Sequence, residues 1–474
     1  MNINLLNISS TLCYIDISYW KFVKITTLDF TILPLYLLII LTISYIHKNK
    51  RIKDNPIYIY YIPGLFVKLI SGIIFCIIYI YYYTGDTLDY FNSSVAMVNL
   101  LQKNFTNFIT LFFNGAKPEY FSFFDTETYW VETHMWRDTR TFFVIRLITP
   151  LVIPGFKSYL TTTVLLAWLS YAGTWRLYKL FCDLYPHLYK RFSIAFLFFP
   201  SVVFWGSGIM KDTITYSAAA WYTYSFYMVF FKKRKVLINI ICLIITSWLL
   251  IKIKPYIFIS LLPGSLIWLS FKRIKNIKNI VIRSLVTPFI LIITVGAGGF
   301  IINSLESDLG SFASYDSMVE KAQIIQQDLK RGQQYGQNYY DIGEFDASFS
   351  SLIGKAPIAI ISGLFRPFIW EIHSPFGIIS AIENTILLIL VLLSFFRLGM
   401  INNFRIILDT PILIFSFLFC TIFAFSVGLA TANFGALVRY RIPLLPFFLA
   451  SQIILVDLYS KQKNKRLFKV LMQK

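Results

Sequence analysis

The sequence has few charged side chains. Only 14% of its 474 residues are Asp, Glu, Lys or Arg, whereas 57% are hydrophobic, and the mean hydropathy is +0.63. A soluble globular chain has about 25% charged residues, so this composition excludes water as the main solvent. Apolar runs of about 20 residues, long enough to cross roughly 30 Å of hydrocarbon, recur along the chain. We therefore expect a single membrane domain.

Several catalytic signatures are also missing. The sequence has no P-loop, no HExxH, no dinucleotide fingerprint and no GxSxG followed by a plausible triad. Its five cysteines form no CxxC pair and have no spacing suited to a metal, which favours buried thiols. These absences argue against cytoplasmic ATP, zinc proteolysis and redox chemistry, and we expect neither a metal nor a cofactor.

Acidic residues are scarce relative to basic ones, with 24 Asp and Glu against 44 Lys and Arg and a net charge of +20. The basic residues form short clusters between the apolar runs, which is the pattern of cytoplasmic loops in membrane proteins. We therefore expect membrane lipid, and not nucleic acid, as a partner. The clusters lie at 48–53, 176–191, 232–235, 272–278 and 461–474.

The apolar runs predict an all-α, polytopic transmembrane helix bundle of about eleven spans, within a range of ten to thirteen. The carboxyl terminus would be cytoplasmic and the amino terminus extracytoplasmic, and the first run would be a retained helix. The expected spans are 29–46, 62–83, 159–178, 192–209, 213–231, 236–251, 256–271, 281–302, 376–396, 411–430 and 442–458.

This topology leaves two large outer loops, 84–158 and 303–375, which hold seven and nine of the 24 acidic residues. Each loop has an interrupted apolar stretch, 142–154 and 357–372, which predicts a helix that lies in the interface or re-enters it. A tilted spanning hairpin is the alternative. The domains would be an amino-terminal segment 1–61, a transmembrane domain 62–460 and a basic cytoplasmic tail 461–474.

The first candidate site is the segment 85–91, GDTLDYF, directly after the second expected span. Asp86 and Asp89 share one face if a helix begins here, and a carboxylate there could act as a base. The alternative is that Asp86 caps the helix and Asp89 stabilises its first turn.

The second candidate site is the segment 133–140, THMWRDTR. Arg137 and Arg140 could hold a phosphate, and His134 could exchange a proton near neutral pH. A solvated loop whose arginines reach the lipid headgroups would explain the same pattern.

Cations also occur in short outer turns, against the usual charge bias. Lys211 and Asp212 end the segment FPSVVFWGSGIMKD, and Lys254 lies in KIKPY. Arg439 and Arg441 begin RYRIPLLPF, where the last span meets the outer face. An anionic ligand would account for these cations, whereas simple capping of the turn would account for Lys211 and Asp212.

The segment 365–371, FRPFIWE, contains Arg366 and Glu371, and Glu383 follows at the start of a span. An ionisable residue in an apolar run is a candidate functional residue. Arg366 and Glu371 could equally pair with each other, and Glu383 could be a capping residue.

Together these segments resemble bacterial polytopic proteins that handle cell-envelope glycans. The nearest group is the superfamily of polyprenyl-phosphate-dependent C-type glycosyltransferases, followed by the O-antigen and capsule polymerases. The resemblance covers about 62–458, although this chain has an additional span before the first outer loop. It implies a protein of the bacterial inner membrane in which an Asp of that loop, here Asp86 or Asp89, is the base.

The resemblance implies that a sugar moves from a polyprenyl-phosphate donor to a glycan, lipid or protein acceptor. The cations near the outer interface would stabilise the leaving phosphate without a metal: Lys211, Lys254, Arg366, Arg439 and Arg441. A polymerase would instead depend on Arg137, Arg140 and Arg366. A lipid-linked glycan transporter is a third possibility, but the inverted repeats typical of transporters are not visible in the sequence.

Overall fold

The computed structural model describes residues 23–276 without Thr84, Phe289, 315–329, 339–372 without residues 344 and 347, and 375–472. These residues form helices and no named strand, and their one isolated β-bridge joins Tyr339 to Asn433. The chain divides into two compact units. The amino-terminal unit contains Met1–Trp175 and Val203–Ser217, and the carboxyl-terminal unit contains Arg176–Val202 and Ala218–Lys474.

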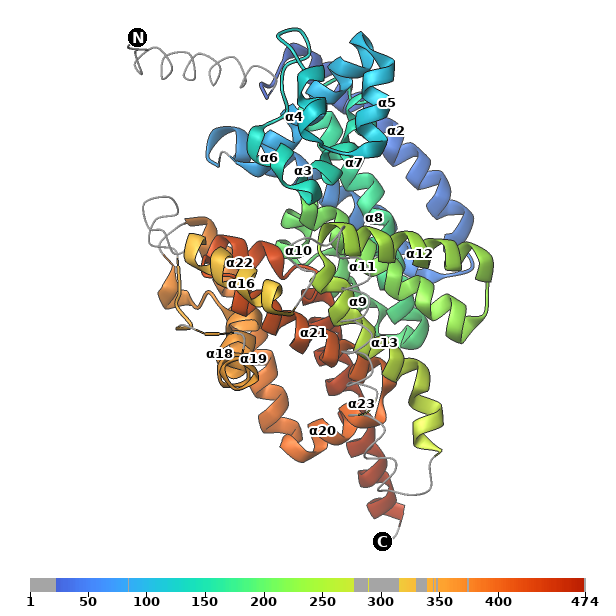
Figure 1. The fold of residues 1–474 in the computed structure, drawn as a ribbon. Helices are drawn as coiled ribbons and strands as arrows, with labels where there is room; N and C mark the ends of the chain where they lie inside the picture. Colours follow the sequence, from blue (N-terminus) through green and yellow to red (C-terminus); the bar gives the residue numbers. More distant parts are fainter. Residues whose placement is uncertain are drawn as a thin grey trace. The chain divides into compact units, whose positions relative to one another are not determined.

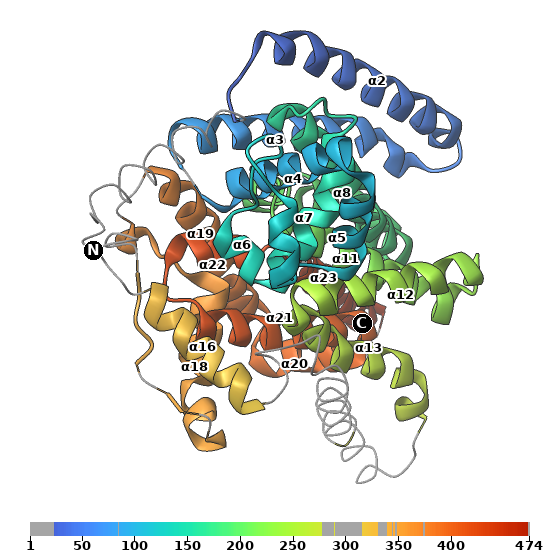
Figure 2. The ribbon, with the colours of Figure 1, turned by 45° about the horizontal axis from the view of Figure 1, so that its top comes forward.

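The amino-terminal unit begins with two long apolar helices, α2 (Thr27–Ile52) and α3 (Tyr61–Tyr81), joined through the 3-10 helix η2 (Pro56–Tyr60). The amino-terminal half of α2 is tied to the unit where Ser158 donates a hydrogen bond to Asp29. Tyr36 there donates another, at 2.5 Å, to the carbonyl of Pro154. The rest of α2 is largely exposed, and Figure 2 shows it running apart from α4 to α7.

The first expected outer loop folds into a helical bundle (Figure 1), because its apolar residues recur on one side of each helix. Phe91 and Val95 of α4 and Val144 and Ile148 of α7 are buried in its core. The stretch 142–154 therefore packs against protein as part of α7, which at 14 residues is about 21 Å long and shorter than the hydrocarbon core. The helices are α4 (Asp86–Lys103), α5 (Phe105–Asn114), η3 (Pro118–Phe123), α6 (Thr133–Arg137) and α7 (Thr139–Val152).

The next helices belong in turn to the first and the second unit, and the sequence predicts them only in part. The expected span 192–209 is instead two short helices, because the proline at 200 disfavours helical backbone in Phe199. The expected span 213–231 ends in a π-helical turn before Lys233, which has a positive φ of 51°. The helices are α8 (Tyr159–Leu184), η4 (Pro186–Leu188), α9 (Tyr189–Leu197), α10 (Pro200–Trp205), α11 (Lys211–Tyr227) and η5 (Met228–Lys232).

The carboxyl-terminal unit is built around the apolar helix α21, which packs against α13, α18 and α23. In Figure 1 the short helix α20 links α19 to α21. The expected span 281–302 lies outside the described residues, except for Phe289. The helices are α12 (Val236–Ile253), α13 (Pro255–Lys275), α16 (Tyr315–Leu329), α18 (Phe349–Phe365), η7 (Ile369–Glu371), α19 (Pro375–Leu398), α20 (Met400–Asp409), α21 (Pro411–Ala430), α22 (Phe434–Tyr440) and α23 (Leu445–Met472).

Helices α18 and α21 approach each other at backbone distance. Ala359 and Gly363 on α18 face Ala424 and Gly428 on α21, so that each helix supplies two small residues four positions apart. This spacing allows two helices to pack closely in a membrane. The stretch 357–372 therefore packs against protein through α18 and then ends in an irregular segment.

Five described helices are long and apolar enough to cross a membrane, and a sixth results if the bent pair α22 and α23 is one span. The predicted bundle of membrane helices is thus confirmed in its class, while eleven spans remain a prediction. The expected span 159–178 is helical, but the threonines, Arg176 and Lys179 of α8 lower its hydropathy. The candidates are Thr27–Ile52, Pro56–Tyr81, Val236–Ile253, Gly377–Leu398 and Pro411–Ala430.

The last expected span, 442–458, is part of the bent pair, in which α22 meets α23 at an angle of 66°. Pro443 lies in the break, where its ring excludes an amide donor and disfavours a helical conformation in the preceding residue. The side chain of Arg441 lies at this break and is fully buried.

We predict that Gly363→Ala lowers the stability of the protein, because the new methyl carbon would lie 2.8 Å from the carbonyl carbon of Ala424. Overpacking of this kind costs about 1–3 kcal/mol. Gly354→Ala on the same helix is the matched control, since nothing lies within 4 Å of the added atom. The midpoint of thermal unfolding in detergent should fall for Gly363→Ala only, and equal midpoints for both variants would contradict the close packing.

Candidate functional site

The amino-terminal unit places the first acidic segment at the start of α4. The N-cap residue is Gly85, whose φ of 136° and ψ of −160° are accessible to glycine but strained for other residues. Asp86 is therefore the first helical residue rather than the N-cap, which corrects the capping alternative. Asp86 and Asp89 both lie in the first turn, where the helix dipole favours negative charge.

Asp89 and His134 form a pair between α4 and α6. The Nε2 atom of His134 lies 3.7 Å from Oδ2 of Asp89, and the two side chains are 61% and 23% exposed. A carboxylate beside an imidazole can accept a proton and transfer it onward. Two of the sequence-predicted segments, 85–91 and 133–140, thus meet at one accessible place.

The second pair of this unit joins Lys211 to Asp138. The lysine donates hydrogen bonds to Oδ2 of Asp138 at 3.1 Å and to Oγ1 of Thr141 at 2.5 Å. Asp138 is also the N-cap of α7 and accepts a hydrogen bond from the backbone N–H of Arg140 at 3.1 Å. Burial would raise the pKa of the Asp138 carboxyl, but the charge of Lys211 and these hydrogen bonds lower it to about 2.

The remaining predicted residues of this unit differ in exposure. Arg137 is exposed at the end of α6, whereas Arg140 is 9% exposed. Asp212 is buried in the first turn of α11. Of these three, Arg137 is the one positioned to meet a ligand from solution.

Within a candidate span, Lys68 is a buried cation that the sequence analysis missed. It lies within α3, is 3% exposed, and donates a 2.5 Å hydrogen bond to the carbonyl of Gly206. Gly206 opens the turn that leads to Lys211, and Gly208 of the same turn packs against Phe75. Lys68 therefore holds the base of the turn that delivers Lys211 to Asp138. A single lysine in an apolar run was the available signal.

The carboxyl-terminal unit surrounds the guanidinium of Arg441 with hydrogen-bond acceptors. Its Nη1 donates to the carbonyls of Leu364 at 3.2 Å and Arg366 at 2.6 Å, and its Nη2 donates to Oδ1 of Asn384. Asn384 in turn donates to the carbonyl of Pro367 at 3.0 Å. Arg441 thus connects the ends of α18 and α22 with α19, while its Nε has no hydrogen-bond partner.

Arg366 lies beside this network. Its Nε is 3.1 Å from Oε1 of Glu371, which confirms that the two residues pair, and its guanidinium lies 5.0 Å from the ring centre of Tyr340. Burial raises the pKa of Tyr340 to about 12, so the phenol is neutral at physiological pH. The Nη1 atom of Arg366 is buried without a hydrogen-bond partner and remains available to an anion.

A third group of cations gathers on Tyr440. The ammonium of Lys254 lies 4.2 Å from its ring centre, and the guanidinium of Arg439 lies 5.0 Å from it. Cations over an aromatic face are stabilised by the ring quadrupole. The sequence-predicted residues Lys254, Arg366, Arg439 and Arg441 therefore all belong to the carboxyl-terminal unit.

Glu383 is a capping residue, although not for its own helix. Its carboxylate accepts hydrogen bonds from the backbone N–H of Ser201, at 2.9 Å, and from the Ser201 hydroxyl. These donors lie at the first turn of α10. The carboxylate thereby satisfies groups that the short helix leaves without partners.

Within the described parts of the chain, no group of three or more His, Cys, Asp or Glu side chains could hold a metal ion. What the two units present is an acidic and imidazole pair with nearby cations in one, and a set of arginines with buried, unsatisfied donors in the other. The first group can exchange a proton, and the second group can bind an anion.

No family model, curated protein or solved structure matches this chain. Its class is therefore defined by its own features: the described residues are helical and include five or six helices suited to a membrane.

We predict that Asp138 stabilises the protein in a pH-dependent way. Because its pKa is lowered from 3.8 to about 2 in the folded state, its contribution is fully present above about pH 4 and is lost as the pH falls towards 2. Asp138→Asn keeps an N-cap oxygen but removes the charge. The difference between the unfolding midpoints of wild type and Asp138→Asn should therefore shrink steadily as the pH falls from 5 towards 2.

Two further variants separate the cap from the ion pair. Asp138→Ala removes both and should cost about 1 kcal/mol more than Asp138→Asn. Asp54→Asn changes an exposed carboxylate of the same unit, and its unfolding midpoint should equal that of wild type at every pH. A difference between wild type and Asp138→Asn that persists at low pH would contradict the ion pair with Lys211.

Proposed function

We propose that this chain is a membrane-embedded glycosyltransferase that moves a sugar from a polyprenyl-phosphate donor to an acceptor in the cell envelope. The acceptor would be a glycan, a lipid or a protein, and the reaction would occur at the extracytoplasmic face of a bacterial inner membrane. The observation that carries the proposal is the 3.7 Å pair of Asp89 and His134 at the start of α4, shortly after the candidate span that ends at Tyr81.

The proposed reaction needs a base and a stabilised leaving group. The acceptor oxygen attacks the anomeric carbon, its proton moves to the carboxylate, and the bond between the sugar and the phosphate oxygen breaks. The electron pair of that bond leaves with the polyprenyl phosphate. The scheme requires no metal, because cations near the phosphate can stabilise its growing charge.

Asp89 is the better candidate for the base than Asp86. Its imidazole neighbour can take the proton and release it to solvent, and its side chain is partly exposed. Arg137 lies at the end of the helix that carries His134 and is the cation of this unit positioned for the phosphate. Lys211 serves mainly to hold Asp138 and thereby α7.

We predict that Asp89→Asn lowers turnover at least about a hundredfold, as expected for a general base, while the unfolding midpoint changes little. The assay is the release of polyprenyl phosphate by the purified protein from a panel of polyprenyl-phosphate sugars. Asp125→Asn is the matched control, since Asp125 is a more exposed carboxylate of the same bundle that pairs with Lys103 at 2.5 Å.

The same assay includes Asp86→Asn, because the resemblance allows either Asp to be the base. A hundredfold loss in Asp86→Asn with normal turnover in Asp89→Asn would assign the role to Asp86. Near-normal turnover in both variants would exclude a base in this segment.

The proposed topology has its own test. We predict that a cysteine at Ser122 reacts with an impermeant maleimide added outside intact cells, whereas a cysteine at Arg234 reacts only after permeabilisation. Both positions are exposed, and the background would lack the five native cysteines. Labelling of the Arg234 position alone would invert the orientation and place Asp89 on the cytoplasmic side.

A polymerase that joins lipid-linked oligosaccharides is the second candidate, because each unit has its own cations. Such an enzyme handles two lipid-pyrophosphate substrates, and the unsatisfied Nη1 of Arg366 is suited to one of them. In that case Arg366→Lys should abolish chain growth, while Asp89→Asn should retain it. The opposite pattern supports the transferase.

A further inference from the structure

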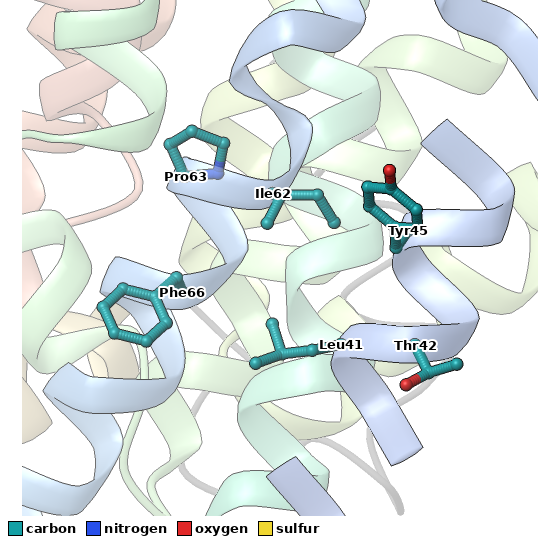
Figure 3. A pocket seen from close by; sticks show the side chains of 6 residues that line it. All are labelled: Leu41, Thr42, Tyr45, Ile62, Pro63 and Phe66. Atoms are coloured by element: carbon teal, nitrogen blue, oxygen red, sulfur yellow. The ribbon is translucent and has the colours of Figure 1, made fainter. Parts of the chain in front are cut away.

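A shallow apolar groove runs between α2 and α3 in the amino-terminal unit (Figure 3). Its volume is about 460 Å³, within the range of about 300–1,000 Å³ typical of small-molecule sites. Tyr45 and Phe66 on its walls are 54% and 50% exposed, so the protein leaves the groove open. The lining residues are Leu41, Thr42, Tyr45, Ile62, Pro63 and Phe66.

The two helices that line the groove are both suited to a membrane, and each has a mean hydropathy near 2. Only 11% of the apolar window of α2 is buried within the protein. Because acyl chains surround such a helix, an acyl chain is the occupant that fits the groove. Leaving bulk lipid for the groove gives little hydrophobic gain, so selection of one lipid must come from its headgroup.

Cations border the end of the groove that faces η2. The ammonium of Lys48 lies 5.6 Å from the ring centre of Tyr45, which lines the groove, and Arg51 donates a 3.2 Å hydrogen bond to the hydroxyl of Tyr58. Lys50 and Lys53 are exposed in the same turn, and Asp54 is the sole carboxylate between residues 46 and 56. The rim therefore has a net positive charge.

Aromatic rings pack behind this rim. His47, Tyr58 and Tyr61 contact one another, with ring centres 5.2–6.0 Å apart, and Tyr61 also meets Trp175. Tyr58 and Trp175 are buried, so these rings hold the end of the groove within the protein. The lysines and Arg51 directly follow the apolar run of α2, which is where the headgroups meet a spanning helix.

We propose that this groove binds one acyl chain of an anionic phospholipid of the cytoplasmic leaflet, whose phosphate lies on Lys48 and Arg51. The basic turn places this end on the side of the membrane where anionic lipids attract Lys and Arg. This inference does not depend on the proposed catalytic activity.

The test uses the full-length protein purified in detergent and titrated with phosphatidylglycerol or phosphatidylcholine, with bound lipids counted by native mass spectrometry. One phosphatidylglycerol should bind in preference to phosphatidylcholine. Lys48→Gln and Arg51→Gln should each weaken it about fivefold, as expected for one charge near the membrane surface. Leu41→Trp should weaken the binding of both lipids because the larger side chain fills the groove. If Leu41→Trp does not fold, Ile62→Trp fills the groove from the other helix and serves instead.

Matched controls exist in the carboxyl-terminal unit. Lys233→Gln with Arg234→Gln neutralises an exposed basic turn, and Leu237→Trp adds bulk on a helix face that is 73% exposed at that residue. Neither should change the binding. The proposal is overturned by equal affinity for the two lipids, by equal losses in the controls, by full affinity in the groove variants, or by displacement of phosphatidylglycerol with equimolar polyprenyl phosphate.

Discussion

The carboxyl-terminal unit depends on the hydrogen bonds that surround the buried guanidinium of Arg441. Burying a charge without water is costly, and the cost is offset only when its donors are hydrogen-bonded. Two backbone carbonyls and the Asn384 amide supply these bonds, and they come from the end of α18, the segment after it and α19. The bend between α22 and α23, the end of α18 and the position of Asn384 are therefore fixed together. The backbone of Arg366 is also fixed, because its carbonyl accepts one of these hydrogen bonds.

In the amino-terminal unit two lysines, and not one arginine, need hydrogen-bond acceptors from the protein. Lys68 holds the carbonyl of Gly206 at the beginning of a turn, and Lys211 holds Asp138 at its end. A turn within a membrane protein needs partners for its backbone groups, because lipid offers none. Lys68 supplies such a partner to the carbonyl of Gly206, and Lys211 pairs with the N-cap residue of α7. His134 lies on α6, whose C-cap residue is Asp138, so the partner of Asp89 is on a helix that ends at this ion pair.

Much of the helical framework could be predicted from the sequence, but few of its contacts. Hydropathy located α2, α3, α12, α19 and α21, because a long apolar run needs no partner to be recognised. It failed at 192–209, where a proline at 200 divides an apolar run into two helices. The site segments were recognised from their polar residues, yet the pairing of Asp89 with His134 depends on the fold of a whole bundle. Lys68 was hidden by its apolar neighbours, and the role of Gly85 depends on a backbone conformation that composition does not reveal.

Lys68 also has a consequence for the synthesis of the protein. Its partner Gly206 follows 138 residues later in the chain. A ribosome adds roughly 5–20 residues per second, so roughly 7–28 s pass between the two residues. A lysine at the centre of a span costs about 2.5–3.5 kcal/mol on insertion scales. During this interval Lys68 lacks the carbonyl partner that it has in the folded protein, and the other apolar residues of the candidate span must offset that cost. The hydrogen bond that joins Lys68 to the later part of this unit can therefore form only after Gly206 has been synthesised.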